Sequence, residues 1–170
     1  MKNKYKSIIV EGPIGVGKTT LATKLASSLG SEIMLEKFSE NPFLEKFYKD
    51  VGKFNKYTKT SKYALATQLY FLLQRADEFK SEEYQALKRN NIVSDYFIDK
   101  DKLFAKTILS SDEYLLYDRV HDGLKLNIEK PSLVIYLQTN AETLLNRIKE
   151  RGIKFEASIT EAYLQKIIDS

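Results

Sequence analysis

The chain has 170 residues, of which 43% are hydrophobic, and a formal net charge of +4. This length suffices for one well-filled core and is too short for two domains, so we expect a single domain over residues 1–170. The chain has no Cys and a single His, His121, which excludes a disulfide framework, a thiolate metal site and a His-based metal cluster. Any bound metal must therefore have oxygen ligands.

The modest positive charge does not predict a nucleic-acid partner. The 27 Lys and Arg residues are spread along the chain and alternate with the 23 acids, whereas a nucleic-acid face usually concentrates one sign. The apolar run at residues 8–10, behind a basic N-terminus, is far too short for a signal peptide or a membrane span. We therefore expect a cytoplasmic protein with no nucleic-acid or membrane partner, and we interpret His121 as a surface or packing residue.

The hydrophobic pattern predicts strands that alternate with helices. In chain order it predicts a strand at 7–11, a helix at 19–29, a strand at 32–36, a helix at 41–48, a long helix at 63–88 with a break near Ser81, a strand at 91–95, helices at 99–109 and 112–126, a strand at 133–137, and helices at 141–151 and 160–168. Apolar strands that alternate with helices imply an α/β fold, a parallel sheet with helices on both faces.

Two stretches stand outside this pattern. Residues 51–62 are rich in Lys and polar residues and are interpreted as an excursion from the fold. The last predicted helix is followed directly by Ser170, with no cap and no further strand. Either the fold ends on a frayed helix or the chain is truncated and lacks a last strand.

The strongest motif is a phosphate-binding loop at residues 12–19, where Gly, four residues and Gly-Lys-Thr lie between a predicted strand and a predicted helix. In such loops backbone N–H groups and the helix N-terminus face the phosphates, the lysine reaches the β- and γ-oxygens and the hydroxyl ligates Mg²⁺. A glycine turn before a capped helix would look similar, but the context favours a P-loop NTPase-type fold. The residues expected to bind ATP are Gly12, Pro13, Ile14, Gly15, Val16, Gly17, Lys18, Thr19 and Thr20.

Two carboxylates end predicted strands, Glu36 the strand at 32–36 and Asp95 the strand at 91–95. Ligands of parallel sheets collect at the carboxyl ends of the strands, so both should face the phosphate loop. One can take a proton from an acceptor hydroxyl and the other can hold Mg²⁺ together with Thr19, which is what phosphoryl transfer needs. The alternative is that these acids only cap or form ion pairs.

Arg147 and Arg151 lie one helical turn apart on one face of a predicted helix. Cations at this spacing can stabilise a transferring phosphoryl group, whose charge spreads over its equatorial oxygens. The alternative is that they only complement the helix dipole.

These motifs resemble those of the deoxynucleoside kinase family, from residue 8 to about residue 168. Glu-Gly-Pro-Ile-Gly-Val-Gly-Lys-Thr-Thr is similar to its phosphate loop, and Glu36 stands where the family's base acts on the 5′-hydroxyl. Asp95 begins the equivalent of its acid-Arg-Ser motif, and Arg147 and Arg151 match the cations of its lid, here at about 151–159. The resemblance implies ATP and Mg²⁺ as cofactors, with Thr19 and Asp95 at the metal, and a nucleoside as substrate.

The same resemblance assigns the remaining substrate contacts. Tyr48 matches a tyrosine that touches the sugar 3′-hydroxyl, and Glu156 falls where a lid glutamate closes on that hydroxyl. Gln68, in Thr-Gln-Leu-Tyr-Phe-Leu-Leu-Gln-Arg, resembles a glutamine that hydrogen-bonds the base, and Arg75 the arginine beside it. Asp101 matches an acid that reads a base amino group. The resemblance also implies a homodimer through exposed helices.

The chain departs from the family pattern at several places. The acid-Arg-Ser motif is Asp95-Tyr96-Phe97, and the family's Glu-Pro is Glu36-Lys37. Residues 51–62 read as an insertion, and the closing helix and strand expected after Ser170 are absent. The Asp-Tyr and Asn-Pro-Phe-Leu sequences are most like a bacterial branch that prefers purines.

The leading hypothesis is therefore an ATP-dependent kinase for the 5′-hydroxyl of a purine deoxynucleoside. Two alternatives stay open. The first is another small-molecule or nucleoside-monophosphate kinase on the same scaffold, and the second is a degenerate nucleotide-binding regulatory domain with little turnover.

Overall fold

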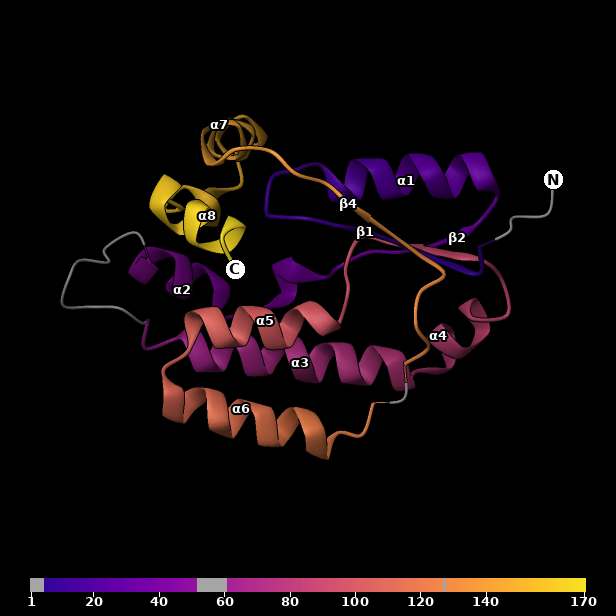
Figure 1. The fold of residues 1–170 in the computed structure, drawn as a ribbon, viewed down its shortest axis with the longest axis horizontal. Helices are drawn as coiled ribbons and strands as arrows, with labels where there is room; N and C mark the ends of the chain where they lie inside the picture. The colour runs from indigo at the N-terminus through magenta and orange to yellow at the C-terminus, as the bar shows by residue number, and fades with distance from the viewer. Residues whose placement is uncertain (1–4, 52–60, 127) are drawn as a thin grey trace.

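The computed structural model describes residues 5–51, 61–126 and 128–170, and in these residues four strands form one parallel sheet in the order β2-β3-β1-β4 (Figure 1). The strands are β1 (Ser7–Glu11), β2 (Glu32–Met34), β3 (Ile92–Ser94) and β4 (Leu133–Tyr136). The helices are α1 (Lys18–Leu29), α2 (Leu44–Val51), α3 (Ala64–Lys80), α4 (Glu82–Leu87), α5 (Asp99–Ile108), α6 (Ser111–Gly123), α7 (Ala141–Arg151) and α8 (Glu161–Ile168), with short 3₁₀ helices η1 (Phe38–Glu40) and η2 (Lys154–Glu156). The predicted α/β fold with a parallel sheet is confirmed.

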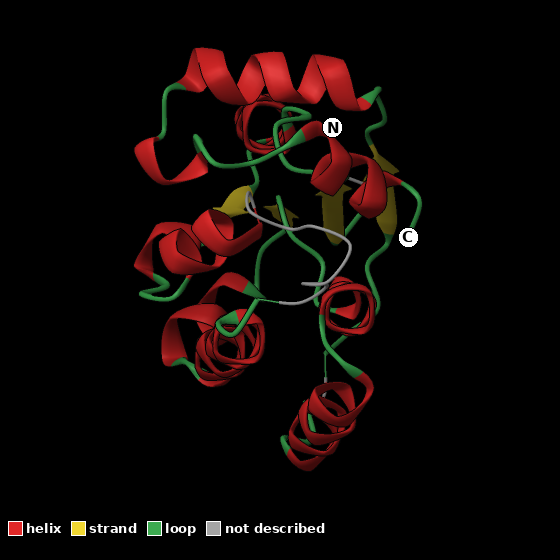
Figure 2. Cartoon of the chain, turned by 90° about the vertical axis from the view of Figure 1, so that its left-hand side faces the viewer, coloured by secondary structure: helices red, strands yellow, loops and turns green. Residues whose placement is uncertain are grey.

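Successive side chains of a strand point to opposite faces of the sheet, and apolar side chains on both faces are covered by helices. One face packs on α1, where Ala22 and Ala26 let the helix approach the buried Val10 and Val93 closely. The other face is covered over β2 and β3, where Met34, Ile92 and Tyr96 pack on Phe79, Tyr84 and Leu87 from α3 and α4. Figure 2 shows the strands as a middle layer with helices above and below.

Few described side chains pack against β4. This strand is an edge of the described sheet, and its residues alternate between half-buried and exposed. Val134 and Tyr136, on the face away from α1, are 42% and 53% exposed. The described residues thus leave one edge and one face of β4 open to solvent, as expected for a sheet without a further strand.

The boundaries of two helices differ from the prediction. The helix expected at 41–48 is α2, which begins at Leu44, because the Asn41 side chain accepts a hydrogen bond from the Phe43 amide at 3.0 Å and closes a turn before it. The helix expected at 112–126 is α6, which ends at Gly123, because Lys125 adopts a left-handed backbone with φ 47°.

The predicted break near Ser81 is confirmed. The Ser81 hydroxyl accepts a hydrogen bond from the Tyr84 amide at 3.1 Å, which caps α4 and separates it from α3. The expected excursion at 51–62 lies outside the described residues except for its ends, where the Ser61 hydroxyl donates to Asp50 at 2.9 Å. In the part of the chain that is described, no helix combines the length and the apolar character needed to cross a membrane.

Gly12→Ala is expected to destabilise the fold. Gly12, directly after β1, has φ +146°, and a Cβ there would collide with the carbonyl oxygen of Leu137. Since conformation and space both exclude a side chain, the free energy of unfolding should fall by about 2 kcal/mol. Chemical denaturation measures the loss, with Gly123→Ala as the control, because a Cβ at Gly123 meets nothing within 4 Å. Equal losses in the two variants would contradict the prediction.

Candidate active site

A cavity of about 130 Å³ opens at the carboxyl ends of β1, β2 and β3. The phosphate loop, Glu36 and Asp95 follow these strands directly or within two residues, while α2, α3, α5 and the segment after α7 supply the other walls. The cavity is lined by Gly12, Ile14, Gly15, Lys18, Thr19, Glu36, Phe38, Leu44, Phe47, Tyr48, Thr67, Gln68, Phe71, Arg75, Asp95, Lys100, Asp101, Phe104, Arg151, Glu156 and Tyr163. Residues far apart in the sequence therefore converge where a parallel sheet binds its ligands.

The phosphate loop has the backbone that its sequence predicts. Gly15 and Gly17 have φ of 81° and 106°, and α1 begins at Lys18. The Lys18 ammonium donates to the carbonyl oxygens of Gly12 at 2.8 Å and Pro13 at 3.1 Å. Burial, and next to it the charge of Lys100, lowers the pKa of Lys18 to about 8. An anion bound in the loop would offset both effects, because a nearby negative charge stabilises the ammonium form.

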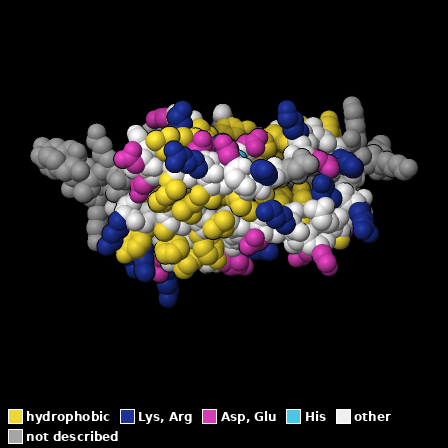
Figure 3. Space-filling model, turned by 90° about the horizontal axis from the view of Figure 1, so that it is seen from below, with side chains coloured by type: hydrophobic (Ala, Val, Ile, Leu, Met, Phe, Trp, Pro, Cys, Tyr) yellow, Lys and Arg dark blue, Asp and Glu magenta, His cyan; other side chains and the backbone are white. Residues whose placement is uncertain are grey.

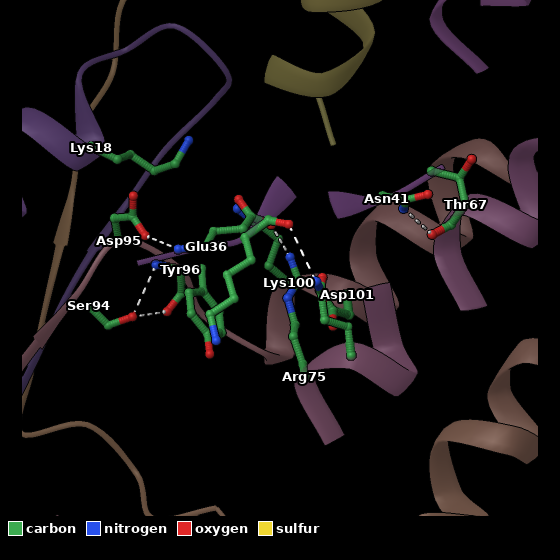
Figure 4. Close-up of polar contacts among 12 residues, drawn as sticks. Lys18, Glu36, Asn41, Thr67, Arg75, Ser94, Asp95, Tyr96, Lys100 and Asp101 are labelled. Atoms are coloured by element: carbon green, nitrogen blue, oxygen red, sulfur yellow. Dashed lines mark hydrogen bonds and ion pairs between the residues drawn. The ribbon is translucent and has the colours of Figure 1, made fainter. Parts of the chain in front are cut away.

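Thr19, Asp95 and Glu36 are joined by hydrogen bonds, and Figure 4 shows the one between Glu36 and Asp95. The Thr19 hydroxyl donates to one Asp95 oxygen at 2.5 Å, and the other Asp95 oxygen accepts from the Glu36 amide at 2.8 Å. The described residues contain no group of three or more His, Asp or Glu side chains that could form a metal cage. One hydroxyl and one carboxylate fit Mg²⁺, which is usually held by one or two protein oxygens together with substrate phosphates and water.

Arg75 connects two carboxylates in the cavity. Its guanidinium donates to Glu36 through one nitrogen and to Asp101 through another (Figure 4). Burial alone would raise the pKa of Glu36, but Arg75, then Lys100 and Lys18, hold it below the ordinary value. Burial raises the pKa of Asp101 even against Arg75. Glu36 is therefore an ionised carboxylate at neutral pH, as a base must be.

Two further predicted residues face the cavity with free polar groups. Gln68 on α3 is 7% exposed, and its amide has no hydrogen-bond partner among the described residues. Tyr48 on α2 is 8% exposed, its ring stacks on Phe155 with a centroid distance of 6.4 Å, and burial raises the pKa of its hydroxyl well above the usual value. Both can make hydrogen bonds to a ligand at no cost to existing ones.

The predicted lid residues are held by protein contacts. Arg151 lines the cavity and donates to both carboxylate oxygens of Glu156, at 2.8 and 2.6 Å, and Glu156 is 2% exposed. Arg147 does not line the cavity, because its guanidinium donates to the carbonyl of Val16 in the phosphate loop at 3.1 Å. Arg151 and Glu156 thus meet the other predicted residues in the cavity, and Arg147 meets the outside of the loop.

The two departures from the family motifs meet at one acid. The Tyr96 hydroxyl donates to Glu78 at 2.8 Å, and Lys37 forms an ion pair with the same carboxylate at 3.2 Å. The Tyr96 ring lies 5.3 Å from the Arg75 guanidinium. Tyr96 is thus a neutral support for Arg75, at the place where the family motif has an arginine.

Sequence reasoning missed part of the cavity. Lys100, beside Asp101 in the first turn of α5, lines the cavity and forms an ion pair with Glu11 at 3.0 Å. Its position next to a predicted site acid was the available signal. Aromatic side chains also line the cavity. Phe71 lies on the same helical stripe as Gln68 and Arg75, at three- and four-residue steps, whereas no spacing separated Phe38 and Phe104 from core residues.

The chain resembles known enzymes over nearly its whole length. It is 33% identical to a deoxyguanosine kinase of Bacillus subtilis over 98% of this chain and 76% of that protein. It is 31% identical to a deoxyadenosine kinase of Lactobacillus acidophilus, over 93% of this chain and 72% of that protein. It therefore spans about three quarters of the length of these two relatives.

A solved structure agrees with this. A deoxyadenosine kinase from M. mycoides, described with the products dCMP and a flexible dCDP bound, superposes with a TM-score of 0.78 at 28% identity, over 96% of this chain and 80% of that one. The family model for deoxynucleoside kinase matches residues 8–170. With the phosphate loop, the acid after β2 and the acid after β3 at one cavity, the chain belongs to the deoxynucleoside kinase family.

Proposed function

We propose that the protein transfers the γ-phosphoryl group of ATP to the 5′-hydroxyl of a purine deoxynucleoside, giving the monophosphate and ADP. The observation that carries this proposal is the joint position of an ionised Glu36 and the phosphate loop on one cavity. Purines are favoured because relatives of the chain are named for deoxyguanosine and deoxyadenosine.

In this proposal the reacting groups lie between the strand ends. Glu36 takes the proton of the 5′-hydroxyl while the 5′-oxygen of the nucleoside bonds to the γ-phosphorus. Lys18 and Arg151 hold the oxygens of the phosphoryl group, and Arg147 supports the loop from Val16. Thr19 and Asp95 would hold Mg²⁺, which neutralises charge on the β- and γ-phosphates when bound.

The nucleoside would be recognised by the wall formed by α2, α3 and α5. The free amide of Gln68 pairs with the base, and Asp101, whose Oδ2 has no partner among the described residues, accepts from a base amino group. Arg75 fixes Asp101 for this contact. Tyr48 and Glu156 serve the sugar 3′-hydroxyl from the side of the lid, about 151–159.

The test is a coupled phosphorylation assay with ATP and Mg²⁺ on deoxyadenosine, deoxyguanosine, deoxycytidine and thymidine. Monophosphate should form fastest from one or both purine nucleosides, and omission of Mg²⁺ with EDTA should abolish it. If only a pyrimidine nucleoside were phosphorylated, the proposed preference for purine bases would be wrong. ATP binding without turnover of any nucleoside would reject the kinase and favour a binding domain.

ATP binding is expected to weaken above about pH 8. In the ligand-free protein Lys18 loses its proton above its pKa of about 8, and only the ammonium form pairs with phosphate. The affinity should thus be constant below this pH and fall by about tenfold per unit well above it. Calorimetric titration with ATP between pH 7 and 9.5 measures the slope, and an unchanged affinity over this range would contradict the prediction.

We also propose a homodimer through α3 and α6, which pack side by side. Figure 3 views the molecule from the side on which these helices lie and shows apolar side chains gathered among charged ones. Leu73 of α3 and Leu115 and Leu116 of α6 are 47%, 57% and 49% exposed. Exposed leucines grouped on two adjacent helices are typical of a protein interface.

Leu115→Lys combined with Leu116→Lys is expected to give a monomer. Two ammonium groups on each copy would face each other across the proposed interface without partners, at a cost of several kcal/mol. Light scattering after size exclusion should give twice the chain mass for the wild type and the chain mass for the variant. Leu29→Lys, at an exposed leucine of α1, is the control and should stay a dimer. A monomeric wild type would reject the interface.

A further inference from the structure

Lys100 is a half-buried cation that no sequence motif indicated. It lies in the first turn of α5, its side chain is 14% exposed, and it lines the cavity. Its ammonium donates to Oε1 of Glu11 at 3.0 Å, and among the described residues it also lies 5.4 Å from the centre of the Phe104 ring. A lysine side chain in such a place loses part of its hydration, so its ammonium group is expected to have an anionic partner.

The partner of Lys100, Glu11, directly precedes the phosphate loop. Glu11 is the last residue of β1, and the same Oε1 also accepts from the Gly12 amide at 2.7 Å. The second oxygen, Oε2, is buried with no partner among the described residues. Glu11 thus holds the ammonium at the base of the loop that receives the phosphates.

The charge of Lys100 also acts on the side of the cavity where the nucleoside would bind, at Glu36. The charge of Lys100 contributes to the lowered pKa of Glu36 and to that of Lys18, so the ammonium acts on both the base and the loop lysine. Figure 4 shows Lys100 beside Glu36, Arg75 and Asp101, with Lys18 and Asp95 to one side. Lys100 therefore lies between the donor and acceptor halves of the cavity.

The described cations of the cavity differ in how firmly they are held. Arg75 is bonded to two carboxylates and Arg151 to both oxygens of one. Lys18 contacts loop carbonyls, whereas Lys100 has one carboxylate oxygen, shared with an amide. At the end of β3 no arginine competes for this place, because residue 96 is a tyrosine bonded to Glu78. Lys100 is free to turn its remaining N–H groups to an anion.

We propose that Lys100 is a further catalytic residue, which donates a hydrogen bond to a non-bridging oxygen of the phosphoryl group while it passes from ATP to the 5′-oxygen. The inference rests on the proposed function. The O5′–P bond forms, the bond from phosphorus to the β–γ bridging oxygen breaks, and the electron pair leaves on ADP. The hydroxyl proton goes to Glu36, and Lys100 stays an ammonium throughout. After transfer the same contact holds the 5′-phosphate of the product.

The test compares Lys100→Gln, Lys100→Arg and the double variant Glu11→Gln/Lys100→Gln. Lys100→Gln should lower kcat by about 100-fold, with little change in the KM for the nucleoside. Lys100→Arg keeps the charge and should retain most of this activity. The double variant replaces the ion pair by two neutral amides. If Lys100 only served to pair with Glu11, kcat would therefore recover in the double variant. We expect its kcat to stay as low as that of Lys100→Gln.

A binding measurement separates this inference from the proposed function. Calorimetry with each deoxynucleoside and its 5′-monophosphate should show that Lys100→Gln binds the monophosphate about tenfold more weakly and the nucleoside equally well. Thermal unfolding checks that the variants are folded. Failure of the wild type to phosphorylate any nucleoside rejects the function, while the monophosphate affinities still decide on Lys100. Wild-type kcat in either Gln variant, or unchanged monophosphate affinity, overturns the inference.

Discussion

Glu36→Gln is expected to lower kcat by about 10³-fold. The amide keeps the size of the side chain and an oxygen that accepts from Arg75, so the cavity should keep its shape. It cannot take the proton of the attacking hydroxyl, because an amide is not a base at neutral pH. Steady-state kinetics with the nucleoside preferred by the wild type measure the loss, and the KM for that nucleoside should change little.

The matched control for this variant is Glu32→Gln. Glu32 is an exposed acid at the start of β2, the strand that precedes Glu36, and its described hydrogen bond is with Asn90 at 3.3 Å. Its kcat should equal that of the wild type. If Glu36→Gln kept more than about a tenth of the wild-type kcat, general-base catalysis would have to come from another group.

Arg75→Met is expected to lower the free energy of unfolding by about 3–5 kcal/mol. Arg75 is 6% exposed, and its loss would leave the half-buried Glu36 and the buried Asp101 without a cation bonded to them. Loss of Arg75 raises the folded-state pKa of Glu36 and raises further that of Asp101, which burial already holds above the ordinary value. The destabilisation should then be largest at neutral pH and shrink as the pH falls and the acids become protonated.

Urea denaturation at pH 7 and pH 5 measures this effect. Arg75→Met combined with Asp101→Asn removes one of the stranded charges and should recover part of the loss. An effect on Arg75→Met below about 1 kcal/mol, or one that grows as the pH falls, would show that the three groups are not an interdependent buried cluster.

The parts of the site that sequence alone predicted are those with a fixed position relative to a strand end. Gly12 to Thr19 form the expected loop because its glycines adopt positive φ, and Asp95 meets Thr19 because parallel strands end at one edge. The difference is that β2 ends at Met34 and β3 at Ser94, so Glu36 and Asp95 project from the chain just after the strands and not from their last residues. The element order follows from strong periodicity, which survives such shifts.

Other features depend on packing that no local pattern encodes. Arg147 and Arg151 share a helical face, yet one bonds the phosphate loop and the other Glu156, because the loop passes beside α7. Lys100 resembles any solvated lysine at a helix start until the fold places Glu11 beside it. The ends of α2 and α6 were set by a side-chain turn at Asn41 and a left-handed Lys125.

Glu78 links the two departures from the family motifs, Lys37 and Tyr96, because both side chains contact its carboxylate. With Lys37 on one side and Tyr96 on the other, each substitution supplies a partner to the same carboxylate. A return to the family residue at one position would strip Glu78 of one partner while the other remained. Because both side chains contact Glu78, we expect the effects of substitutions at positions 37 and 96 on stability to be non-additive.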